Sequence, residues 1–208
     1  MCWNPQISLS TFIFGIAAIA IGYINGIFDW KWSVLCFTIV SMQLLEYFIW
    51  TKKEWNRILS IIGLCIIISQ PIAAGLVIEN STYQKLYYIL YLVWISIFLA
   101  YPRHFSTTIG KDGHLRWNWL DISIFSVIIW TLFILAAIHL SNYISLFKEV
   151  LVFIFIIGLV SISWYFYRKN GTWGSVYCSF INIQFIFILA NAFYIQYSSK
   201  YNCFRIQK

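Results

Sequence analysis

Long, uninterrupted runs of apolar residues constrain the fold of this 208-residue chain more than any other feature. A helix needs about 20 apolar residues to cross a bilayer core of roughly 30 Å, and these runs have that length. A β-barrel would need short strands of alternating polarity, which the runs lack. The sequence predicts an all-α, polytopic transmembrane bundle of seven helices with short loops, forming one domain over residues 1–197. The predicted helices cover residues 8–26, 31–50, 56–78, 84–101, 119–140, 146–167 and 173–196, and a polar tail follows at 198–208.

Charged residues make up only 10% of the chain, whereas soluble domains contain about 25%. This composition excludes an ordinary soluble domain. The net charge of +7 comes from Lys and Arg in the loops and the tail, where such residues set membrane orientation. Their distribution over the loops predicts an N-terminus inside and a C-terminus outside. No basic stripe lies on a soluble face, so we expect the lipid bilayer as a partner and no nucleic acid.

The five cysteines show neither CxxC nor Cys/His spacing. Zinc sites depend on such spacing, so no metal site and no cofactor are expected. Free cysteines inside apolar segments behave as small hydrophobic residues. Three of them lie in predicted helices: Cys36, Cys65 and Cys178.

The loop at residues 102–118 is the longest connection and carries its own folding signal. Lys111-Asp112-Gly113 has the composition of a tight turn. The flanking stretches 107–109 and 114–117 are suited to short strands. Together they predict a small hairpin between the fourth and fifth helices.

Polar side chains inside the apolar segments are the first candidates for function. Gln43 and Glu46 are three residues apart and therefore share a helix face. Glu46 lies about one turn from the predicted inner interface, and Gln43 lies deeper. Gln70 precedes Pro71, which removes one amide and frees the carbonyl of Ile67. These groups either line a pocket or path for an ion or small molecule, or hold neighbouring helices together.

The seventh predicted helix is the most polar. Ser175, Ser179 and Asn182 follow the i, i+4, i+7 pattern of one helix face. That face should turn inward, because lipid cannot satisfy an amide. The residues predicted to line a ligand or ion pathway are Gln43, Glu46, Gln70, Ser179 and Asn182.

The predicted topology brings several polar motifs to one face of the membrane. The N-terminal MCWN, the end of the second helix, the loop GKDGHLRWNW and the turn RKNGTWGS all fall on the inner side. We therefore expect an inner mouth where these motifs meet. Its candidate residues are Cys2, Trp3, Asp112, His114, Arg116 and Trp117.

The motifs MCWN, SMQLLEYFIW, SQPIAAGL, DGHLRWNW and GTWGSVYC together resemble an uncharacterised family of small multi-pass membrane proteins. That family is known from large DNA viruses, algae and bacteria, and its members start Met-Cys-Trp-Ser or Met-Cys-Trp-Asn. The resemblance extends from Cys2 to Cys178, with Tyr177 standing where the family pattern has Trp. It implies no activity. The positions carried over are Cys2, Trp3, Gln43, Glu46, Gln70, Pro71, Gly113, His114, Trp117, Gly174 and Cys178.

Three functions fit these patterns. The first is binding or translocation of a small molecule or ion through a polar pocket that opens to the inner face. The second is a membrane-embedded enzyme that modifies lipid, with Glu46 or His114 as acid or base, although no triad or metal-ligand set is present. The third is a structural or interaction protein. Binding is favoured over catalysis, because the sequence shows no recognisable catalytic triad or metal-ligand set.

Overall fold

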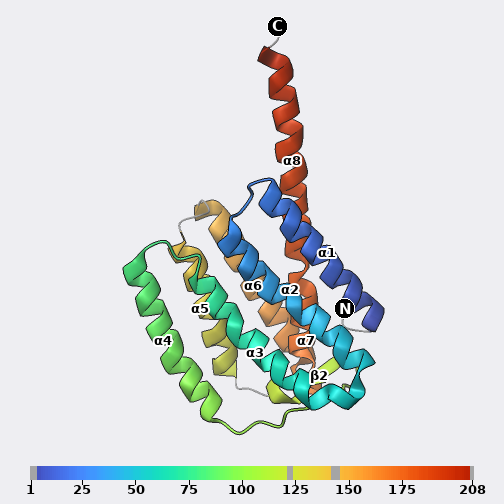
Figure 1. Cartoon of the computed structure of the whole chain (residues 1–208). Coiled ribbons are helices and arrows are strands. Elements are labelled where there is room, and N and C mark those ends of the chain that lie inside the picture. The colour runs from blue at the N-terminus through green and yellow to red at the C-terminus, as the bar shows by residue number, and fades with distance from the viewer. Residues whose placement is uncertain (1–3, 121–123, 142–145, 207–208) are drawn as a thin grey trace.

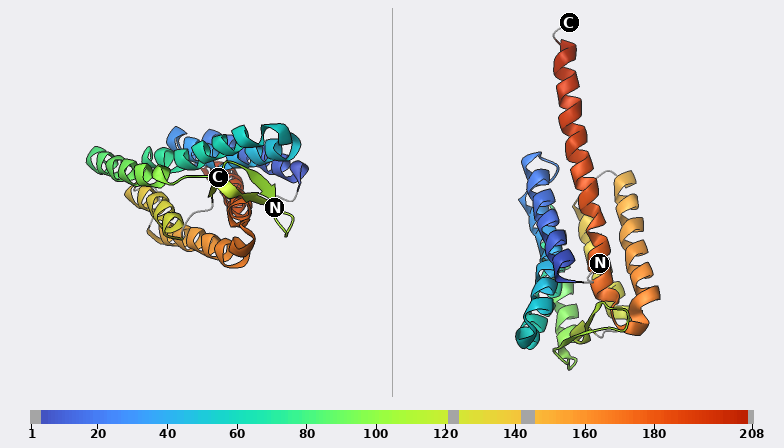
Figure 2. Two further views of the ribbon diagram at one scale, coloured as in Figure 1. Left: turned by 90° about the horizontal axis from the view of Figure 1, so that it is seen from below. Right: turned by 90° about the vertical axis from the view of Figure 1, so that its right-hand side faces the viewer.

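The computed structural model describes residues 4–120, 124–141 and 146–206, and leaves the side chains of residues 147–148, 179–181 and 195–206 undescribed. The helices run up and down along one axis (Figure 1). Viewed along that axis, α1 to α4 form one row, α5 and α6 form a second, and α7 with α8 stands between them (Figure 2). The helices are α1 (Pro5–Ile24), α2 (Trp30–Thr51), α3 (Asn56–Gly75), α4 (Ser81–Ala100), α5 (Ile124–Leu140), α6 (Leu146–Tyr167), α7 (Trp173–Ile181) and α8 (Ile183–Ile206).

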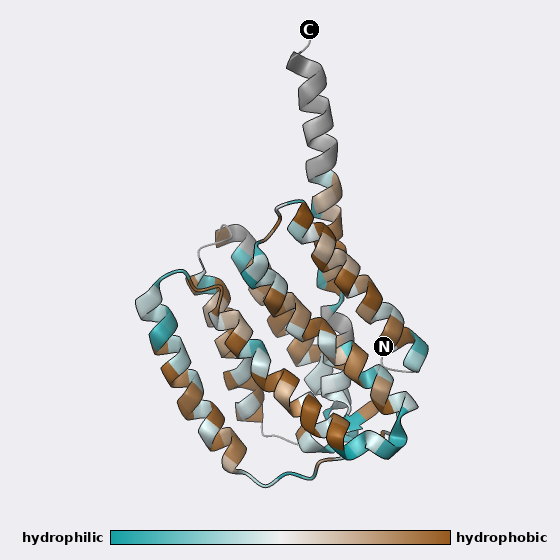
Figure 3. Cartoon of the chain, in the orientation of Figure 1, coloured by the Kyte–Doolittle hydropathy of each residue, from teal (hydrophilic) through white to brown (hydrophobic). Residues whose placement is uncertain are grey.

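Length and hydropathy identify the chain as a multi-pass membrane protein. Six helical spans are long and apolar enough to cross a membrane, with α7 and the first half of α8 counted as one span. α5 is equally apolar but has only 17 residues. Apolar residues follow the helices and polar residues gather at their ends (Figure 3). On the outer face of α4, Ile89 and Val93 are more than half exposed, and a bilayer would cover them. The predicted all-α bundle is confirmed.

Short polar side chains fix where the first helices begin. Asn4 caps α1 by accepting a hydrogen bond from the Ile7 amide at 2.9 Å. Asp29 caps α2 in the same way through the Lys31 amide, also at 2.9 Å. Asn80 caps α4. Each cap satisfies amides that have no partner within the helix, and this ends the preceding loop at a defined residue.

The contact between α1 and α2 depends on a residue without a side chain. A Cβ atom at Gly15 would collide with the side chain of Val40 on α2 and would lie 3.4 Å from the ring of Phe185 on α8. Val40 and Phe185 are fully buried. Gly15 therefore lets α1 approach α2 and α8 closely, as small residues do between transmembrane helices.

The predicted hairpin is confirmed. β1 (Thr107–Ile109) pairs antiparallel with β2 (Leu115–Trp117), with Thr108 opposite Arg116. The hairpin is anchored to α3, because the buried Thr107 hydroxyl lies 3.0 Å from Ser60 Oγ and accepts from Trp119 Nε1 at 3.2 Å. We call the end of the bundle with this hairpin and the α6–α7 turn the hairpin end.

The fifth helix does not start at residue 119 as predicted. Residues 118–120 form one 3-10 turn, and the described part of α5 covers Ile124–Leu140. Trp119 is only 1% exposed and packs beside Gly63 of α3. The indole of Trp119 is therefore buried in the core beside the hairpin, and residues 118–120 belong to the hairpin end.

The seventh predicted helix, residues 173–196, is interrupted. α7 ends at Ile181 and α8 begins at Ile183. Asn182 lies between them, and its side-chain amide donates to the Cys178 carbonyl at 3.1 Å. Asparagine side chains compete in this way with the backbone ladder of a helix, which explains the break.

The second half of α8 extends the chain beyond the predicted helix end. It continues through the polar tail to Ile206 and projects from the bundle (Figure 1). The start of α1 lies at the hairpin end, and α8 ends at the opposite one (Figure 1). The two termini thus lie at opposite ends of the bundle, whereas their assignment to inside and outside stays a prediction.

We expect Gly15→Val to destabilise the bundle by about 1–3 kcal/mol, because overpacking a close helix contact displaces neighbouring side chains. Thermal unfolding in detergent measures the change. Gly158→Val is the matched control, since nothing lies within 4 Å of a Cβ at Gly158. Equal midpoints for the two variants would contradict the close α1–α2 contact.

Candidate functional site

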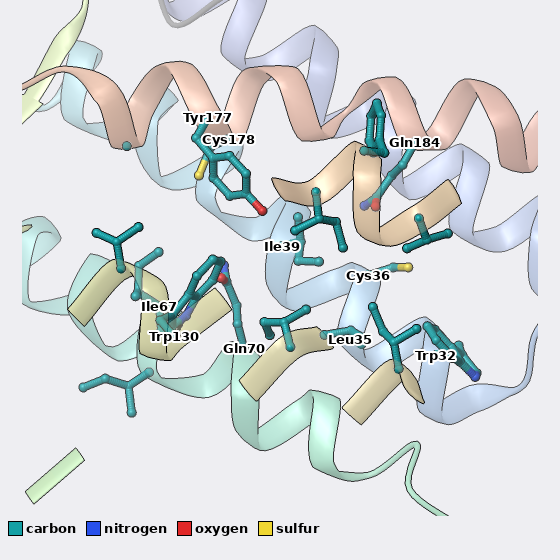
Figure 4. Close-up of a pocket in the computed structure, with 18 of the residues that line it drawn as sticks. Trp32, Leu35, Cys36, Ile39, Ile67, Gln70, Trp130, Tyr177, Cys178 and Gln184 are labelled. Atoms are coloured by element: carbon teal, nitrogen blue, oxygen red, sulfur yellow. Dashed lines mark hydrogen bonds between the residues drawn. The ribbon is translucent and has the colours of Figure 1, made fainter. Parts of the chain in front are cut away.

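A cavity of about 710 Å³ lies inside the bundle (Figure 4). It is lined by α2, α3 and α4 on one side, by α5 and α6 on the other, and by α7 and α8 between them. It reaches from Trp117 and Trp173 at the hairpin end to Ile27 and Phe28 of the α1–α2 loop at the opposite end. Small-molecule sites typically measure about 300–1,000 Å³. The cavity is therefore an elongated space large enough for one hydrophobic molecule.

The wall of this cavity is apolar and uncharged. Among the described residues that line it, none is Asp, Glu, Lys, Arg or His. Much of the surface is aromatic, from Trp32 on α2, Trp94 on α4, Trp130 on α5 and Phe155 on α6. A charged molecule would lose its hydration here with no opposite charge to compensate. The chemistry of the wall favours an uncharged, apolar occupant.

Pro71 frees one backbone carbonyl of α3 close to the cavity, and aromatic side chains donate to this carbonyl and to the next one. Pro71 lacks the N–H that would otherwise bond to the Ile67 carbonyl. The indole N–H of Trp130 on α5 donates to that carbonyl at 3.4 Å. The hydroxyl of Tyr91 on α4 donates to the Ile68 carbonyl at 2.6 Å. Aromatic donors from two neighbouring helices thus satisfy groups that lipid cannot satisfy.

Gln70 is the predicted pathway residue that lines the cavity. It is 2% exposed, and its amide nitrogen makes a long hydrogen bond of 3.4 Å to the Thr38 carbonyl on α2. In Figure 4 its amide lies beside Trp130, facing the interior of the cavity. Gln70 therefore contributes to both the α2–α3 contact and the cavity wall.

The other predicted pathway residues lie elsewhere. Gln43 is 1% exposed and accepts a hydrogen bond from Thr11 Oγ1 at 3.0 Å, which joins α1 to α2. Glu46 is fully buried one turn further along α2, and Asn182 is buried at the α7–α8 break. Of these three described side chains, none lines the cavity. The side chain of Ser179 is outside the described residues.

Several polar wall residues were not among the predicted site residues, including Ser126 on α5 and Asn191 on α8. Tyr177 on α7 and Gln184 on α8 both line the cavity. They are seven residues apart, so they share a face of the predicted seventh helix. That spacing is a usable signal, but the polar face predicted from the sequence was a different one, formed by Ser175, Ser179 and Asn182.

At the hairpin end, Asp112 fastens the hairpin to the α6–α7 turn. One carboxylate oxygen accepts from Thr172 Oγ1 at 2.6 Å and from Asn170 Nδ2 at 3.0 Å. The other accepts from the His114 amide at 3.3 Å. Burial alone would raise the pKa of Asp112, but these hydrogen bonds outweigh it and hold the pKa below its ordinary value.

The remaining described mouth residues lie against the same turn. His114 is 5% exposed, its ring meets Tyr167 edge-on, and burial lowers its pKa despite the nearby Asp112 carboxylate. The Arg116 side chain covers Gly171. The structure therefore brings the predicted DGHLRW and RKNGTWG motifs together. Trp117 packs beside Gly174, and the predicted Cys2 and Trp3 lie outside the described residues.

No cluster of three or more His, Cys, Asp or Glu side chains that could hold a metal occurs among the described residues. The described ion pair between His139 of α5 and Glu149 of α6, at 2.7 Å, joins two helices. The uncharged cavity is therefore the best-supported binding site, and the hairpin end closes the bundle beside it.

We expect Asp112→Asn to weaken hairpin docking and to remove part of the acid sensitivity of the fold. A carboxyl group whose folded pKa is lowered stabilises the protein above its unfolded pKa, about 4, and loses that stabilisation as the pH falls through the folded pKa. Wild-type thermal midpoints should therefore drop at acid pH more steeply than those of Asp112→Asn.

Lys111→Gln is the matched control, because Lys111 is an exposed neighbour in the same turn. Its pH profile should follow that of the wild type. A profile for Asp112→Asn identical to both would show that the Asp112 carboxylate does not hold the hairpin in place.

No protein-family model, curated protein or solved structure matches the chain. The resemblance to the small multi-pass family stays a prediction, and it assigns no activity. The residues that line the cavity are therefore the evidence for its role.

Proposed function

We propose that this protein binds one uncharged, hydrophobic molecule in the cavity between α2–α4 and α5–α6. The observation that carries the proposal is the combination of a volume of about 710 Å³ with a wall free of charge among its described residues. Burial of apolar surface would drive binding, at roughly 25 cal/mol per Å² removed from water or a polar headgroup. This is small-molecule binding, in an apolar cavity instead of the expected polar pocket.

The chemistry of the cavity wall and the length of the cavity also bear on what the protein could transport. An ion crossing the bundle would need polar or charged groups to replace its water. Aromatic and aliphatic side chains surround most of this space, so ion translocation is disfavoured. The cavity does extend between the two ends of the bundle. That extension is consistent with movement of a hydrophobic molecule along the bundle axis.

The remaining alternatives receive less support. Acid–base chemistry needs a titratable group within hydrogen-bond reach of the substrate, and the described cavity wall holds no carboxylate and no imidazole. At the hairpin end, both oxygens of Asp112 accept hydrogen bonds that dock the hairpin. Asp112 is better suited to holding structure than to catalysis.

Ile39→Trp tests the proposal directly. Ile39 projects into the middle of the cavity from α2 (Figure 4), and an indole there would obstruct the space. Native mass spectrometry of protein released from detergent would measure retained hexadecanol, a neutral single-chain probe. We expect one hexadecanol on the wild type and at least a tenfold loss of occupancy in Ile39→Trp.

Val34→Trp is the matched control. Val34 belongs to the same helix but is 36% exposed and lies outside the cavity wall. Its occupancy should equal that of the wild type. Equal retention by all three proteins, or no retention by the wild type, would contradict binding in the cavity. Thermal unfolding checks that both variants are folded.

A further inference from the structure

We propose that the cavity selects a lipid that carries an uncharged hydroxyl group, held by Gln70, Tyr177 and Gln184. This inference rests on the proposed binding function and specifies the class of ligand. The three side chains come from α3, α7 and α8 and line the same cavity. In Figure 4 their polar ends point into the space around Ile39.

The position of the Tyr177 hydroxyl is fixed by the packing of its ring. The ring stands edge-on against Trp130, with ring centres 6.0 Å apart and planes at 88°. Trp130 also makes a long hydrogen bond of 3.4 Å to the Ile67 carbonyl. The Tyr177 ring thus packs against Trp130, and its hydroxyl points into the cavity (Figure 4).

The two glutamine amides leave hydrogen-bonding capacity unused. The side-chain nitrogen of Gln184 is buried and has no hydrogen-bond partner among the described residues. Among the described residues, the Gln70 nitrogen has a single hydrogen bond, to the Thr38 carbonyl at 3.4 Å, which is near the limit of a hydrogen bond. Buried donors without good partners cost free energy, so a ligand group that accepts from them gains affinity.

The kind of polar group that fits follows from these side chains. Amides and a phenol both donate and accept hydrogen bonds, as a hydroxyl does. A carboxylate, phosphate or ammonium would need an opposite charge, and the described cavity wall has none. An apolar wall with a few neutral polar side chains therefore matches a long-chain or fused-ring alcohol better than a charged phospholipid headgroup.

The test is a competition measured by native mass spectrometry. Wild-type protein is incubated in detergent with hexadecanol and hexadecane at equal concentration, and in parallel with cholesterol or hexadecanoate. We expect the wild type to retain hexadecanol over hexadecane and hexadecanoate. Retention of cholesterol as well would identify a site for fused-ring alcohols, and its absence would restrict the site to chain alcohols.

Tyr177→Phe removes one hydroxyl and keeps the ring against Trp130. We expect its preference for hexadecanol over hexadecane to fall about fivefold, because one hydrogen bond contributes roughly a factor of five. Gln184→Leu should lower the same ratio. Tyr194→Phe is the control, since Tyr194 lies on the same helical span but is 71% exposed, and its ratio should equal that of the wild type.

The outcomes separate the two proposals. Equal binding of hexadecanol and hexadecane by the wild type, with both blocked by Ile39→Trp, would overturn the hydroxyl site and leave the binding function standing. An unchanged ratio in Tyr177→Phe and Gln184→Leu would also overturn the hydroxyl site. Failure of the wild type to retain any neutral probe would overturn the binding function and this inference together.

Discussion

Side chains of α4 and α5 donate hydrogen bonds to backbone carbonyls of α3 around Pro71, inside an apolar bundle. Tyr87 of α4 donates to the Pro71 carbonyl at 2.8 Å, and Tyr91 and Trp130 satisfy neighbouring carbonyls. Unsatisfied groups are costly in lipid. These bonds therefore attach α4 and α5 to α3 at defined positions. The same residues Tyr91 and Trp130 form part of the cavity wall.

The hairpin end provides the second constraint. Thr107 ties the hairpin to α3 through Ser60 and Trp119, and Asp112 ties its tip to the α6–α7 turn. The hairpin thus connects both rows of helices beneath the cavity. Because the two rows are joined at this end and along α3, the space between them can stay open without separating the bundle.

The sequence predicted the parts of the fold that depend on residue patterns along the chain. Runs of about 20 apolar residues identify membrane helices, and Lys111-Asp112-Gly113 located the hairpin. The break at Asn182 was missed, because an asparagine in an apolar segment does not reveal whether its side chain bonds to the backbone. The 3-10 turn at residues 118–120 was not predicted, because the sequence around Trp119 is also compatible with the start of a helix. Only the hydrogen bond from Trp119 to Thr107 places this residue with the hairpin.

The candidate site was harder to predict, because a cavity is defined by packing between distant segments. Polarity drew attention to Gln70, which lines the cavity, and also to Gln43, which bonds to Thr11 and does not line the cavity. The wall consists mainly of aromatic and aliphatic residues, and composition cannot distinguish these from ordinary core. Their role followed only from the arrangement of the helices.

The most direct test of this account is an experimental density map of the protein purified in lipid without added ligand. We predict one continuous, elongated density between α2–α3 and α5–α6, in contact with Ile39 and close to Tyr177. A map in which α6 packs directly onto α2 and closes the space would contradict the account. So would a cavity that contains only ordered water.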